Sequence, residues 1–341
     1  MHSPIGASST SYAASEGKSC RGWATQCRRP PRLLPLVVNA PNQQPSAGIR
    51  YNARAVAEPV VALESALITH GFAPPQNLYV AREMEQAVRM AGAKPATIAV
   101  IQGQVKVGVT ADELTYLASA KHVRKCSTRD LGIVIGLGLD GSTTVAATMF
   151  LAAKHGIQVL ATGGIGGVHR GHPFDVSADL TELSRTPVTV VSAGAKALLD
   201  LALTFERLET LGVPVIGYGT DEIPAFFSRR SGLRADVRVD SPQDVVRIVR
   251  ARRARKLPGG ELVCVPLPPE AELPLDIAEA AIAEAQRCAD AQGIHGADAT
   301  PFMLQQIAEL TEGASVRANI ALLLNNARVA AEIARALASS P

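Results

Sequence analysis

The chain is long enough for one large α/β domain or two small ones, because it has 341 residues and 47% of them are hydrophobic. A net charge of +3 and an aromatic content of 4% argue against nucleic-acid binding, which favours a basic surface and stacking side chains. The five cysteines match no common zinc module, and no apolar run reaches the roughly 18 residues needed to cross a membrane, so we expect a cytoplasmic protein that binds neither nucleic acid nor membrane.

Residues 1–55 differ in composition from the rest of the chain. They are rich in Ser, Ala, Pro and Arg, and Glu16 is their only acidic residue. A segment of this kind buries too little apolar surface to fold alone, so we predict a disordered extension followed by a folded domain over 56–341. The low-acid leader also fits an organellar transit peptide, and that alternative stays open beside a simple flexible extension.

The rest of the chain alternates strands with helices, which predicts a three-layer α/β/α domain with a helical C-terminal tail. Apolar runs predict strands at 59–65, 96–101, 105–109, 157–161, 187–191, 213–216 and 261–266. Helical spacing predicts helices at 77–91, 145–155, 179–184, 197–211, 241–256, 275–292, 300–311 and 315–338. Asn77 is the expected N-cap of the first helix, and Thr110 with Glu113 forms a capping box that begins a further short helix.

Glu64 closes the first apolar run, PVVALES. Parallel strands of α/β folds present functional side chains at their carboxyl ends, and a carboxyl group beside an apolar strand can have the raised pKa that a general acid requires. A solvated glutamate at a strand end is an equally good interpretation of the same residues.

Two later segments are candidates for anion binding. The charged segment 124–130, RKCSTRD, is typical of a solvated turn but could supply a cation to a phosphate group. The small residues at 140–144 open the helix predicted at 145–155, whose first N–H groups could bind an anion. The simpler alternative is that Ser142 or Thr143 caps that helix.

The stretch 161–196 carries the densest chemistry in the chain. A glycine-rich turn at 163–167 follows a strand and leads to His169 and two aspartates, and the stretch ends at Lys196. Backbone donors, carboxylates and a lysine suit a phosphorylated substrate, a cation and an amine nucleophile, with the turn and its neighbouring cations holding the phosphate. An ordinary βα loop followed by a surface lysine is the alternative. The turn is not a dinucleotide fingerprint, because the third glycine of GxGxxG would fall on His169.

The last predicted helix contains three asparagines. Asn319 lies one turn from the helix start and is the best placed to reach a ligand. Asn325 and Asn326 are expected to be supporting or capping groups.

Nine motifs, in this order, resemble the pseudouridine-5′-phosphate glycosidase family, which includes proteins associated with indigoidine clusters. They are PVVALES, THGFAPPQN, PATIAVI, STTVAATM, ATGGIGGVHRG, SADLTEL, SAGAKALLDLALTFERLET, GVPVIGY and TPFMLQQIAELTEG. The resemblance covers about 59–338, so it implies that 56–341 is a catalytic domain of this kind.

The resemblance implies a homotrimeric enzyme that reversibly cleaves the carbon–carbon glycosidic bond of pseudouridine 5′-phosphate to uracil and ribose 5-phosphate. It implies a divalent metal cofactor, typically Mn²⁺ with Mg²⁺ as the alternative, held by Asp175. It implies that Lys196 is the nucleophile that forms a covalent sugar adduct and that Glu64 is the proton donor. The other residues it implies bind substrate: Lys125, Val145, Thr162, His169, Ser177, Ala178, Asp179 and Asn319.

The sequence departs from the family pattern in three places. Ala66 stands where the family has a threonine beside the acid, and the segment 127–130 has one arginine fewer. The loop 171–175 is shorter than usual, which leaves the geometry around Asp175 open. None of these changes removes a residue assigned to chemistry.

The implied chemistry is consistent with these residue types. The leaving group is a carbon atom of the base, so the acid must protonate carbon, and a lysine adduct that opens the sugar ring replaces one hard step by two easier ones. A lone aspartate suits Mn²⁺ or Mg²⁺ that keeps most of its waters. The alternatives are a Schiff-base aldolase or sugar-phosphate lyase, and a catalytically silent sugar-phosphate-binding regulatory protein.

Overall fold

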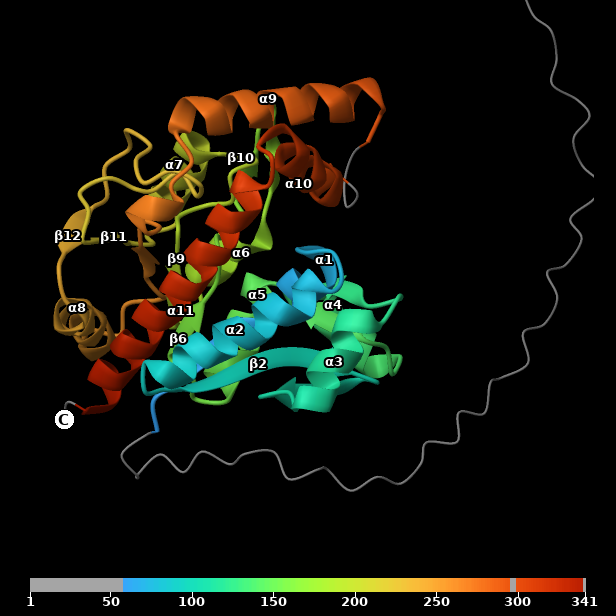
Figure 1. Ribbon diagram of the computed structural model, residues 1–341. Coiled ribbons are helices and arrows are strands. Elements are labelled where there is room, and N and C mark those ends of the chain that lie inside the picture. The colour runs from blue at the N-terminus through green and yellow to red at the C-terminus, as the bar shows by residue number, and fades with distance from the viewer. Residues whose placement is uncertain (1–57, 295–298, 340–341) are drawn as a thin grey trace, which may run out of the picture. The chain divides into compact units, whose positions relative to one another are not determined.

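The computed structural model describes residues 58–294 and 299–339, in which strands and helices alternate along most of the chain (Figure 1). The extension predicted at 1–55 lies outside the described residues. The strands are β1 (Val60–Glu64), β2 (Lys94–Ile101), β3 (Gln104–Val107), β4 (Arg124–Cys126), β5 (Gly141–Thr143), β6 (Val159–Ala161), β7 (Val168–His169), β8 (His172–Val176), β9 (Thr189–Ser192), β10 (Leu199–Asp200), β11 (Val215–Tyr218), β12 (Val237–Val239) and β13 (Leu262–Cys264). The helices are α1 (Ala66–His70), α2 (Gln76–Met90), α3 (Ala111–Ser119), α4 (Thr128–Gly136), α5 (Val145–Lys154), α6 (Ala178–Leu183), α7 (Leu201–Thr210), α8 (Pro242–Ala254), α9 (Leu275–Ala291), α10 (Ala299–Leu310) and α11 (Ala314–Ser339).

Ten strands form one sheet in which β1 is central. The order is β12-β11-β13-β9-β6-β1-β2-β5-β4, with β3 also paired to β2. The pairs from β12 to β2 are parallel, whereas β2 pairs antiparallel with β3 and β5. A second, three-stranded antiparallel sheet has the order β10-β7-β8. The carboxyl ends of β1, β6 and β9 therefore meet at one edge, where parallel sheets present functional groups.

Both faces of the large sheet are covered, and the residues of β1 show why. Val61 and Leu63 belong to the hydrophobic cluster that includes α2, α8 and α11, whereas Val60 and Ala62 belong to the cluster that includes α5 and α6. Alternate side chains of a strand point to opposite faces, so a strand buried on both sides reads as a continuous apolar run. The three-layer α/β/α prediction is confirmed.

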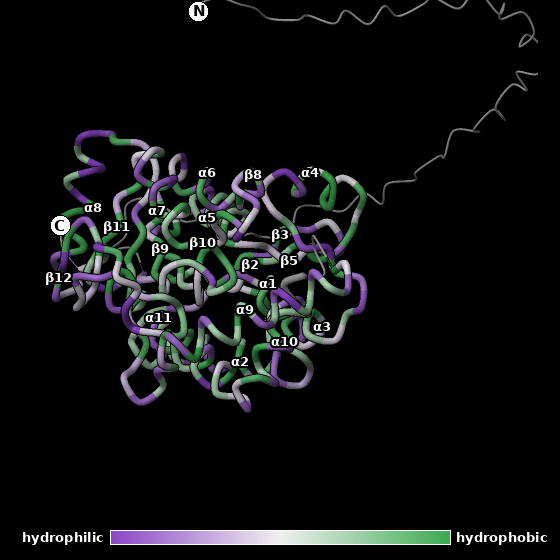
Figure 2. The backbone as a smooth tube through the Cα atoms, turned by 90° about the horizontal axis from the view of Figure 1, so that it is seen from above, coloured by the Kyte–Doolittle hydropathy of each residue, from purple (hydrophilic) through white to green (hydrophobic). Residues whose placement is uncertain are grey.

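The C-terminal helical segment forms part of one outer layer. In Figure 1, α11 runs diagonally across the face of the sheet, and it packs against β1, β6 and β9 as well as α2 and α8. In Figure 2 hydrophobic residues follow the interior elements and hydrophilic stretches mark the outer loops. Helix α11 therefore packs against β1 and β6, the strands that lead to Glu64 and Thr162.

Most predicted elements are confirmed with shifted ends, and the capping box of Thr110 and Glu113 is present. The N-cap prediction for Asn77 is wrong, because α2 begins at Gln76. The buried Asn77 amide instead donates hydrogen bonds to the carbonyl oxygens of Ile68 and Ala118, both at 2.9 Å. Asn77 therefore ties α2 to two neighbouring helices.

Three further local predictions are wrong because pairing with distant residues decided the local structure. The segment 124–130 is not a turn: it forms β4 and the start of α4. Ser142 and Thr143 lie in β5, and Thr144 takes the N-cap position of α5. The helix predicted at 197–211 begins only at Leu201, because the two residues before it form β10.

In the described part of the chain, no helix is both long enough and apolar enough to cross a membrane.

Leu160 tests how much the covered sheet contributes to stability. Its side chain is fully buried in β6, so Leu160→Ala should lower the free energy of unfolding by about 2 to 5 kcal/mol, measured by urea denaturation. The matched control is Leu203→Ala on α7, where the side chain is 45% exposed and the change should stay within about 0.5 kcal/mol. Equal losses in the two variants would contradict burial of the Leu160 side chain in the layer that includes α5 and α6.

Candidate active site

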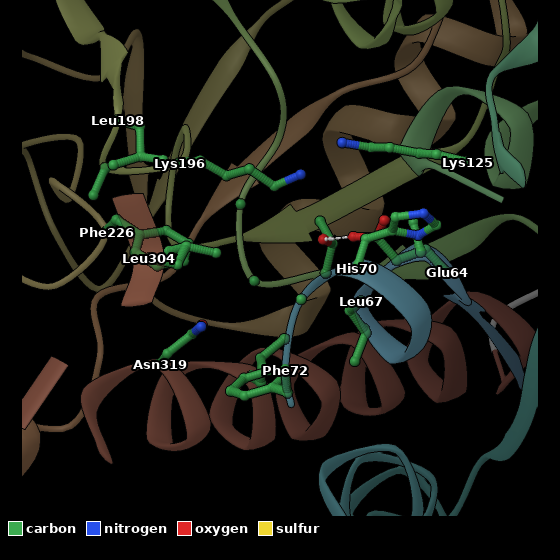
Figure 3. A pocket seen from close by; sticks show the side chains of 17 residues that line it. Glu64, Leu67, His70, Phe72, Lys125, Lys196, Leu198, Phe226, Leu304 and Asn319 are labelled. Carbon is green, nitrogen blue, oxygen red and sulfur yellow. Dashed lines mark hydrogen bonds between the residues drawn. The ribbon is translucent and has the colours of Figure 1, made fainter. Parts of the chain in front are cut away.

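A cavity of about 90 Å³ opens at the carboxyl ends of the central strands (Figure 3). Five of the predicted site residues line it: Glu64, Lys125, Thr162, Lys196 and Asn319. They come from β1, β4, the turn after β6, the loop after β9 and helix α11. The fold thus gathers side chains that are separated by up to 255 positions in the sequence (319 minus 64).

The sheet register brings Lys125 to the level of Glu64. Glu64 is the partner of Ile98 on β2, and the next residue of β2, Ala99, is the partner of Ser142 on β5. Ser142 is in turn the partner of Lys125 on β4. Because β4 is the last strand on this side of the sheet, Lys125 is a cation that the edge strand places at the level of Glu64.

Glu64 is almost completely buried, with 4% of its surface exposed. Loss of hydration raises the pKa of its carboxyl group, while the charge of Lys196 and a hydrogen bond from Thr162 oppose that rise. The Thr162 hydroxyl donates to Glu64 Oε1 at 2.5 Å. The carboxyl group predicted from the strand end is therefore a buried acid with its orientation fixed.

Lys196 is held by backbone contacts on both sides. Its own N–H donates to the carbonyl oxygen of Ile165 at 3.0 Å, and its carbonyl oxygen accepts from Leu199 N–H at 3.0 Å. Gly194, two residues earlier, has φ +84°, and a Cβ there would lie 2.6 Å from the carbonyl oxygen of Pro224. Only glycine fits this turn, which delivers the lysine side chain into the cavity.

Lys125 approaches the same space from the opposite wall. Figure 3 shows the side chains of Lys125 and Lys196 pointing toward one another. Burial lowers the pKa of Lys125, the positive charge of Lys196 lowers it further, and the carboxyl groups of Glu64 and Asp179 oppose this. The two amines and the buried acid are thus electrostatically coupled.

A second pocket of about 500 Å³ adjoins the first and shares Lys125 and Lys196 with it. Ser127 and Thr144 line this pocket at the N-caps of α4 and α5. Their hydroxyl oxygens are buried and have no hydrogen-bond partner among the described residues. Buried polar atoms are costly without partners, so these two hydroxyls are available to a polar ligand.

Two further predicted groups lie in the second pocket. His169 on β7 lines it, and so do Ser177 and Ala178 at the start of α6. Arg129, from the charged segment, adds a further cation to the lining. The second pocket therefore combines cations with the positive ends of two helix dipoles, a combination suited to an anion.

The glycine-rich turn is closed by contacts within the protein. The N–H groups of Ile165, Gly166 and Val168 donate to Gly194, Asp179 and Thr204. These donors cannot also hold a phosphate group, so this part of the predicted glycine cradle is wrong.

Close packing is the physical reason for the glycines in this turn. A Cβ at Gly166 would lie 2.3 Å from Ser177 Oγ, and one at Gly164 would lie 2.8 Å from the Phe226 ring. The glycines therefore bring the turn against its neighbours, which places Lys196 and the acid close to one another.

Asp179 lines the second pocket, whereas Val145 lines neither pocket. The Asp179 carboxylate accepts from Ala146 N–H at 2.9 Å and from Gly166 N–H at 2.7 Å, so it joins α5 to the glycine turn. The Val145 side chain is fully buried in the core and lines neither pocket. A substrate contact by Val145 would therefore involve its backbone, at the start of α5.

Asp175 lies on β8, is exposed, and lines the second pocket. Among the described residues there is no group of three or more His, Cys, Asp or Glu side chains that could hold a metal ion together. A single carboxylate fits Mn²⁺ or Mg²⁺ that keeps most of its waters, and it does not fit a closed zinc site.

Several cavity residues were not identified from the sequence. His70, the last residue of α1, lines the cavity, as do the apolar side chains of Phe72, Phe226 and Leu323. No local motif marks the apolar residues, because they come from separate loops and helices. His70 follows Glu64 by only six positions. A prediction of the short helix α1 between them would have suggested that both residues lie in one site.

Asn319 and its neighbours on α11 separate into the roles predicted for them. Asn319 lines the cavity. Asn325 donates to the carbonyl oxygen of Pro266 at 3.2 Å, and the fully buried Asn326 donates to that of Thr162 at 2.9 Å. Asn326 therefore supports the turn that carries the hydrogen-bond donor to Glu64.

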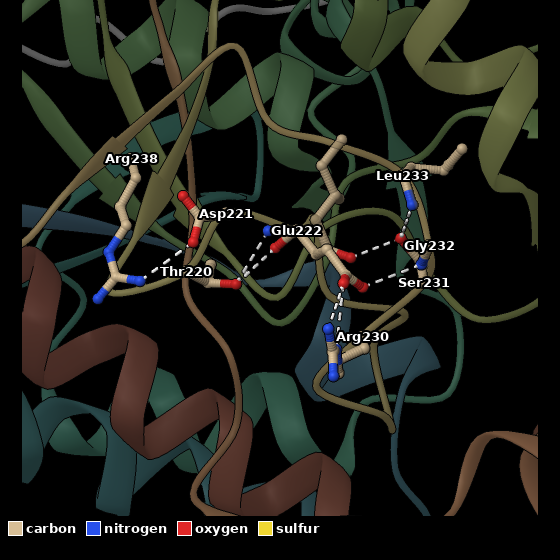
Figure 4. A network of polar contacts seen from close by, with 9 residues as sticks. Thr220, Asp221, Glu222, Arg230, Ser231, Gly232, Leu233 and Arg238 are labelled. Atoms are coloured by element: carbon tan, nitrogen blue, oxygen red, sulfur yellow. Dashed lines mark hydrogen bonds and ion pairs between the residues drawn. The ribbon is translucent and has the colours of Figure 1, made fainter.

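The loop that brings Phe226 over the cavity is braced by a polar network (Figure 4). Glu222 accepts from the Arg230 guanidinium at 2.7 Å and from Gly232 N–H at 3.2 Å. Arg238 donates to Asp221 at 3.2 Å, beside the same loop. Phe226 itself has φ +62°, and its N–H donates to the Ala193 carbonyl oxygen at 3.3 Å. The network thus fixes an aromatic wall beside Lys196.

Comparison with known proteins places this site among enzymes. Residues 51–336 match the family model described as indigoidine synthase A like protein. Proteins named pseudouridine-5′-phosphate glycosidase from Paracoccus denitrificans and Jannaschia sp. are 56% and 54% identical, covering 83% and 84% of this chain and 94% and 95% of theirs.

Two solved structures share the fold. The prealnumycin C-glycosynthase AlnA in complex with ribulose 5-phosphate has a TM-score of 0.76 at 42% identity, covering 82% of this chain and 92% of that chain. An indigoidine synthase A-like protein from Thermotoga maritima has a TM-score of 0.75 at 37% identity, with coverages of 81% and 92%.

The raised pKa of Glu64 gives the pH dependence of stability a definite sign. The native state holds this proton more tightly than the unfolded chain, so stability falls as pH rises from 4.5 through the folded-state pKa. Glu64→Gln removes this loss, and its advantage over the wild type in urea unfolding should grow with pH.

Glu279→Gln is a control of opposite sign, because the hydrogen bond from Arg170 lowers the pKa of Glu279. That carboxylate contributes stability above its unfolded-state pKa and loses it as pH falls, so the variant should lose most at neutral pH. A pH-independent difference between Glu64→Gln and the wild type would contradict a buried acid at Glu64.

Proposed function

This chain belongs to the indigoidine synthase A-like family, and we propose that it is an enzyme, a pseudouridine-5′-phosphate glycosidase that cleaves its substrate reversibly to uracil and ribose 5-phosphate. The observation that carries the proposal is the buried acid Glu64 in one cavity with Lys196. A carbon leaving group needs a proton donor that stays protonated near neutral pH, and a covalent route needs an amine beside it.

Lys196 is the nucleophile in the proposed reaction. Its uncharged amine forms a bond to the sugar C1′ atom, and the bond from C1′ to the ring oxygen breaks. The ring opens, and the oxygen takes up the proton that the newly bonded nitrogen gives up. The nitrogen lone pair then forms a C1′=N bond while the electron pair of the bond to the base moves to carbon C5 of the base. Water hydrolyses the resulting imine, which releases ribose 5-phosphate and restores the amine.

Glu64 supplies the proton that C5 receives. The Thr162 hydroxyl donates to Oε1, so the acidic proton of Glu64 is carried by Oε2. Burial favours the protonated form because loss of hydration raises the carboxyl pKa. Without a proton, the departing base would have to leave as a carbanion in an apolar cavity.

The second pocket is the proposed phosphate site. Lys125, Arg129 and His169 line it, together with the unpartnered hydroxyls of Ser127 and Thr144. The N-termini of α4 and α5 add N–H donors and a favourable dipole for a phosphate group. Because Lys196 lines both pockets, a phosphate bound in the second pocket would place the sugar beside the nucleophile.

A divalent ion at Asp175 remains part of the proposal. Asp175 would hold a largely hydrated Mn²⁺ or Mg²⁺ in the second pocket, where the ion would neutralise phosphate charge. The contribution of the chain itself is the carboxylate and the neighbouring polar lining, which bind and orient the anion.

A homotrimer is supported by exposed apolar side chains at one edge of the molecule. Ile133 and Ile135 on α4, and Leu137 and Leu139 just after it, are all exposed. Phe174 on β8 is 99% exposed, and α4 and β8 both contribute residues to the second pocket. Such a group of exposed apolar side chains marks a site of protein association.

Borohydride trapping with ribose 5-phosphate separates the two catalytic roles. The wild type and Glu64→Gln should both form a reduced adduct that peptide mapping assigns to Lys196, whereas Lys196→Ala should form none. Glu64→Gln keeps the adduct because adduct formation from free sugar needs no proton on C5. Uracil release from pseudouridine 5′-phosphate should be abolished in Lys196→Ala and fall about 10² to 10⁴-fold in Glu64→Gln, because release of the base does need that proton. An adduct at another lysine, or no uracil release by the wild type, would refute the assignment.

Light scattering coupled to gel filtration tests the assembly. The wild type should have the mass of a trimer, and Leu137→Asp should shift it toward the monomer, because this side chain is 69% exposed in a single chain. Leu203→Asp, on the exposed face of α7, is the matched control and should leave the mass unchanged. A monomeric wild type would rule out the proposed trimer.

A further inference from the structure

His70 lies in the cavity with Glu64 and Lys196, and nothing in the proposed reaction uses it. It is the last residue of α1, and Figure 3 shows its ring close to Glu64 in projection, both belonging to the cavity lining. The hydrogen bond that this ring can form with a substrate depends on which of its two nitrogens carries the proton.

Hydrogen bonds at Nδ1 assign the tautomer of His70. The Thr69 hydroxyl donates to Ser142 Oγ at 2.7 Å, and the same Thr69 oxygen lies 2.5 Å from His70 Nδ1. Because Thr69 has already used its only hydroxyl proton, the proton in the short contact with His70 belongs to Nδ1. Ser142 Oγ also faces Nδ1, but at 3.4 Å it is the much weaker contact. A neutral ring with its proton on Nδ1 carries a lone pair on Nε2, so Nε2 is an acceptor.

The surroundings keep this ring neutral. Partial burial lowers the pKa of His70, and the positive charge of Lys125 lowers it further. A neutral ring cannot donate from Nε2 while Nδ1 holds the proton. His70 therefore offers the cavity an acceptor, whereas the protonated Glu64 offers it a donor.

A pyrimidine base carries ring N–H groups that need acceptors when the base enters an apolar cavity. Leu67, Phe72 and Phe226 form apolar parts of the wall and offer no side-chain acceptor. We propose that His70 Nε2 accepts a hydrogen bond from a ring N–H of the base and so selects bases that are unmethylated at that nitrogen. This inference rests on the proposed function, because it names the group that reads the leaving base.

The experiment compares two substitutions that keep different halves of the imidazole. The amide of His70→Asn can reach the position of Nδ1 and retain the contact with Thr69, but it offers nothing at Nε2. The longer His70→Gln side chain can place its amide oxygen where Nε2 stood and so restore an acceptor. A merely structural role for His70 would favour Asn, whereas the proposed role favours Gln.

Base release is measured with pseudouridine 5′-phosphate and with its analogues methylated at N1 or at N3. The wild type should reject one of the two analogues, which identifies the nitrogen that is read. His70→Asn should lower kcat/KM for the parent substrate about 10- to 100-fold without lowering it for that analogue, and His70→Gln should recover most of the loss.

The results separate this inference from the function beneath it. Absence of base release from the parent substrate by the wild type would refute the proposed glycosidase activity. With an active wild type, an unchanged preference for the parent over both analogues in His70→Asn would overturn the role of His70. Recovery by Asn instead of Gln would overturn it as well, because it would assign His70 to holding Thr69.

Discussion

Burial of the Glu64 carboxyl group at the end of β1 is the constraint on which the rest of the site depends. Loss of hydration favours the protonated form, and the hydrogen bond from Thr162 orients the group without restoring the lost water. The central position of β1, flanked on both sides by parallel strands and covered on both faces, makes this burial possible. A glutamate at the end of an edge strand would be hydrated and would ionise at its ordinary pKa.

The groups that surround this acid are held by interactions that also fix the fold. Asp179 uses its carboxylate to join α5 to the glycine turn, and Asn326 supports the turn from α11. Within that turn, the carbonyl oxygen of Ile165 accepts a hydrogen bond from the backbone N–H of Lys196. Because each contact links elements far apart in the sequence, the positions of acid and amine depend on the complete domain, and a change in α11 can disturb the site without touching a ligand.

Local sequence patterns were sufficient for much of the fold, and for the site they were sufficient only in part. The apolar run that ends at Glu64 predicted the buried strand, since burial of a continuous apolar strand needs no knowledge of its neighbours, but it left a buried acid and a solvated one as equal alternatives. The segment 124–130 was misjudged because its pairing with β5 is non-local. The glycine turn was misjudged for a similar reason: the partners that occupy its N–H groups, Gly194 and Thr204, lie far along the chain. His70 became recognisable only because α1 brings it to the lining of the cavity.

The division into two pockets that share Lys125 and Lys196 resolves a conflict between the two ends of the substrate. A phosphate group requires cations and hydration, whereas the bond that breaks requires a dry acid. If both ends were bound in one open pocket, water would hydrate Glu64 and lower the pKa on which proton donation depends. Placing the polar hydroxyls and cations in the larger pocket lets binding of the phosphate orient the sugar, while the smaller, mostly apolar cavity favours the protonated form of its acid. The shared lysines stand at the boundary, where the sugar carbon has to lie if one lysine is to attack it while the base faces Glu64.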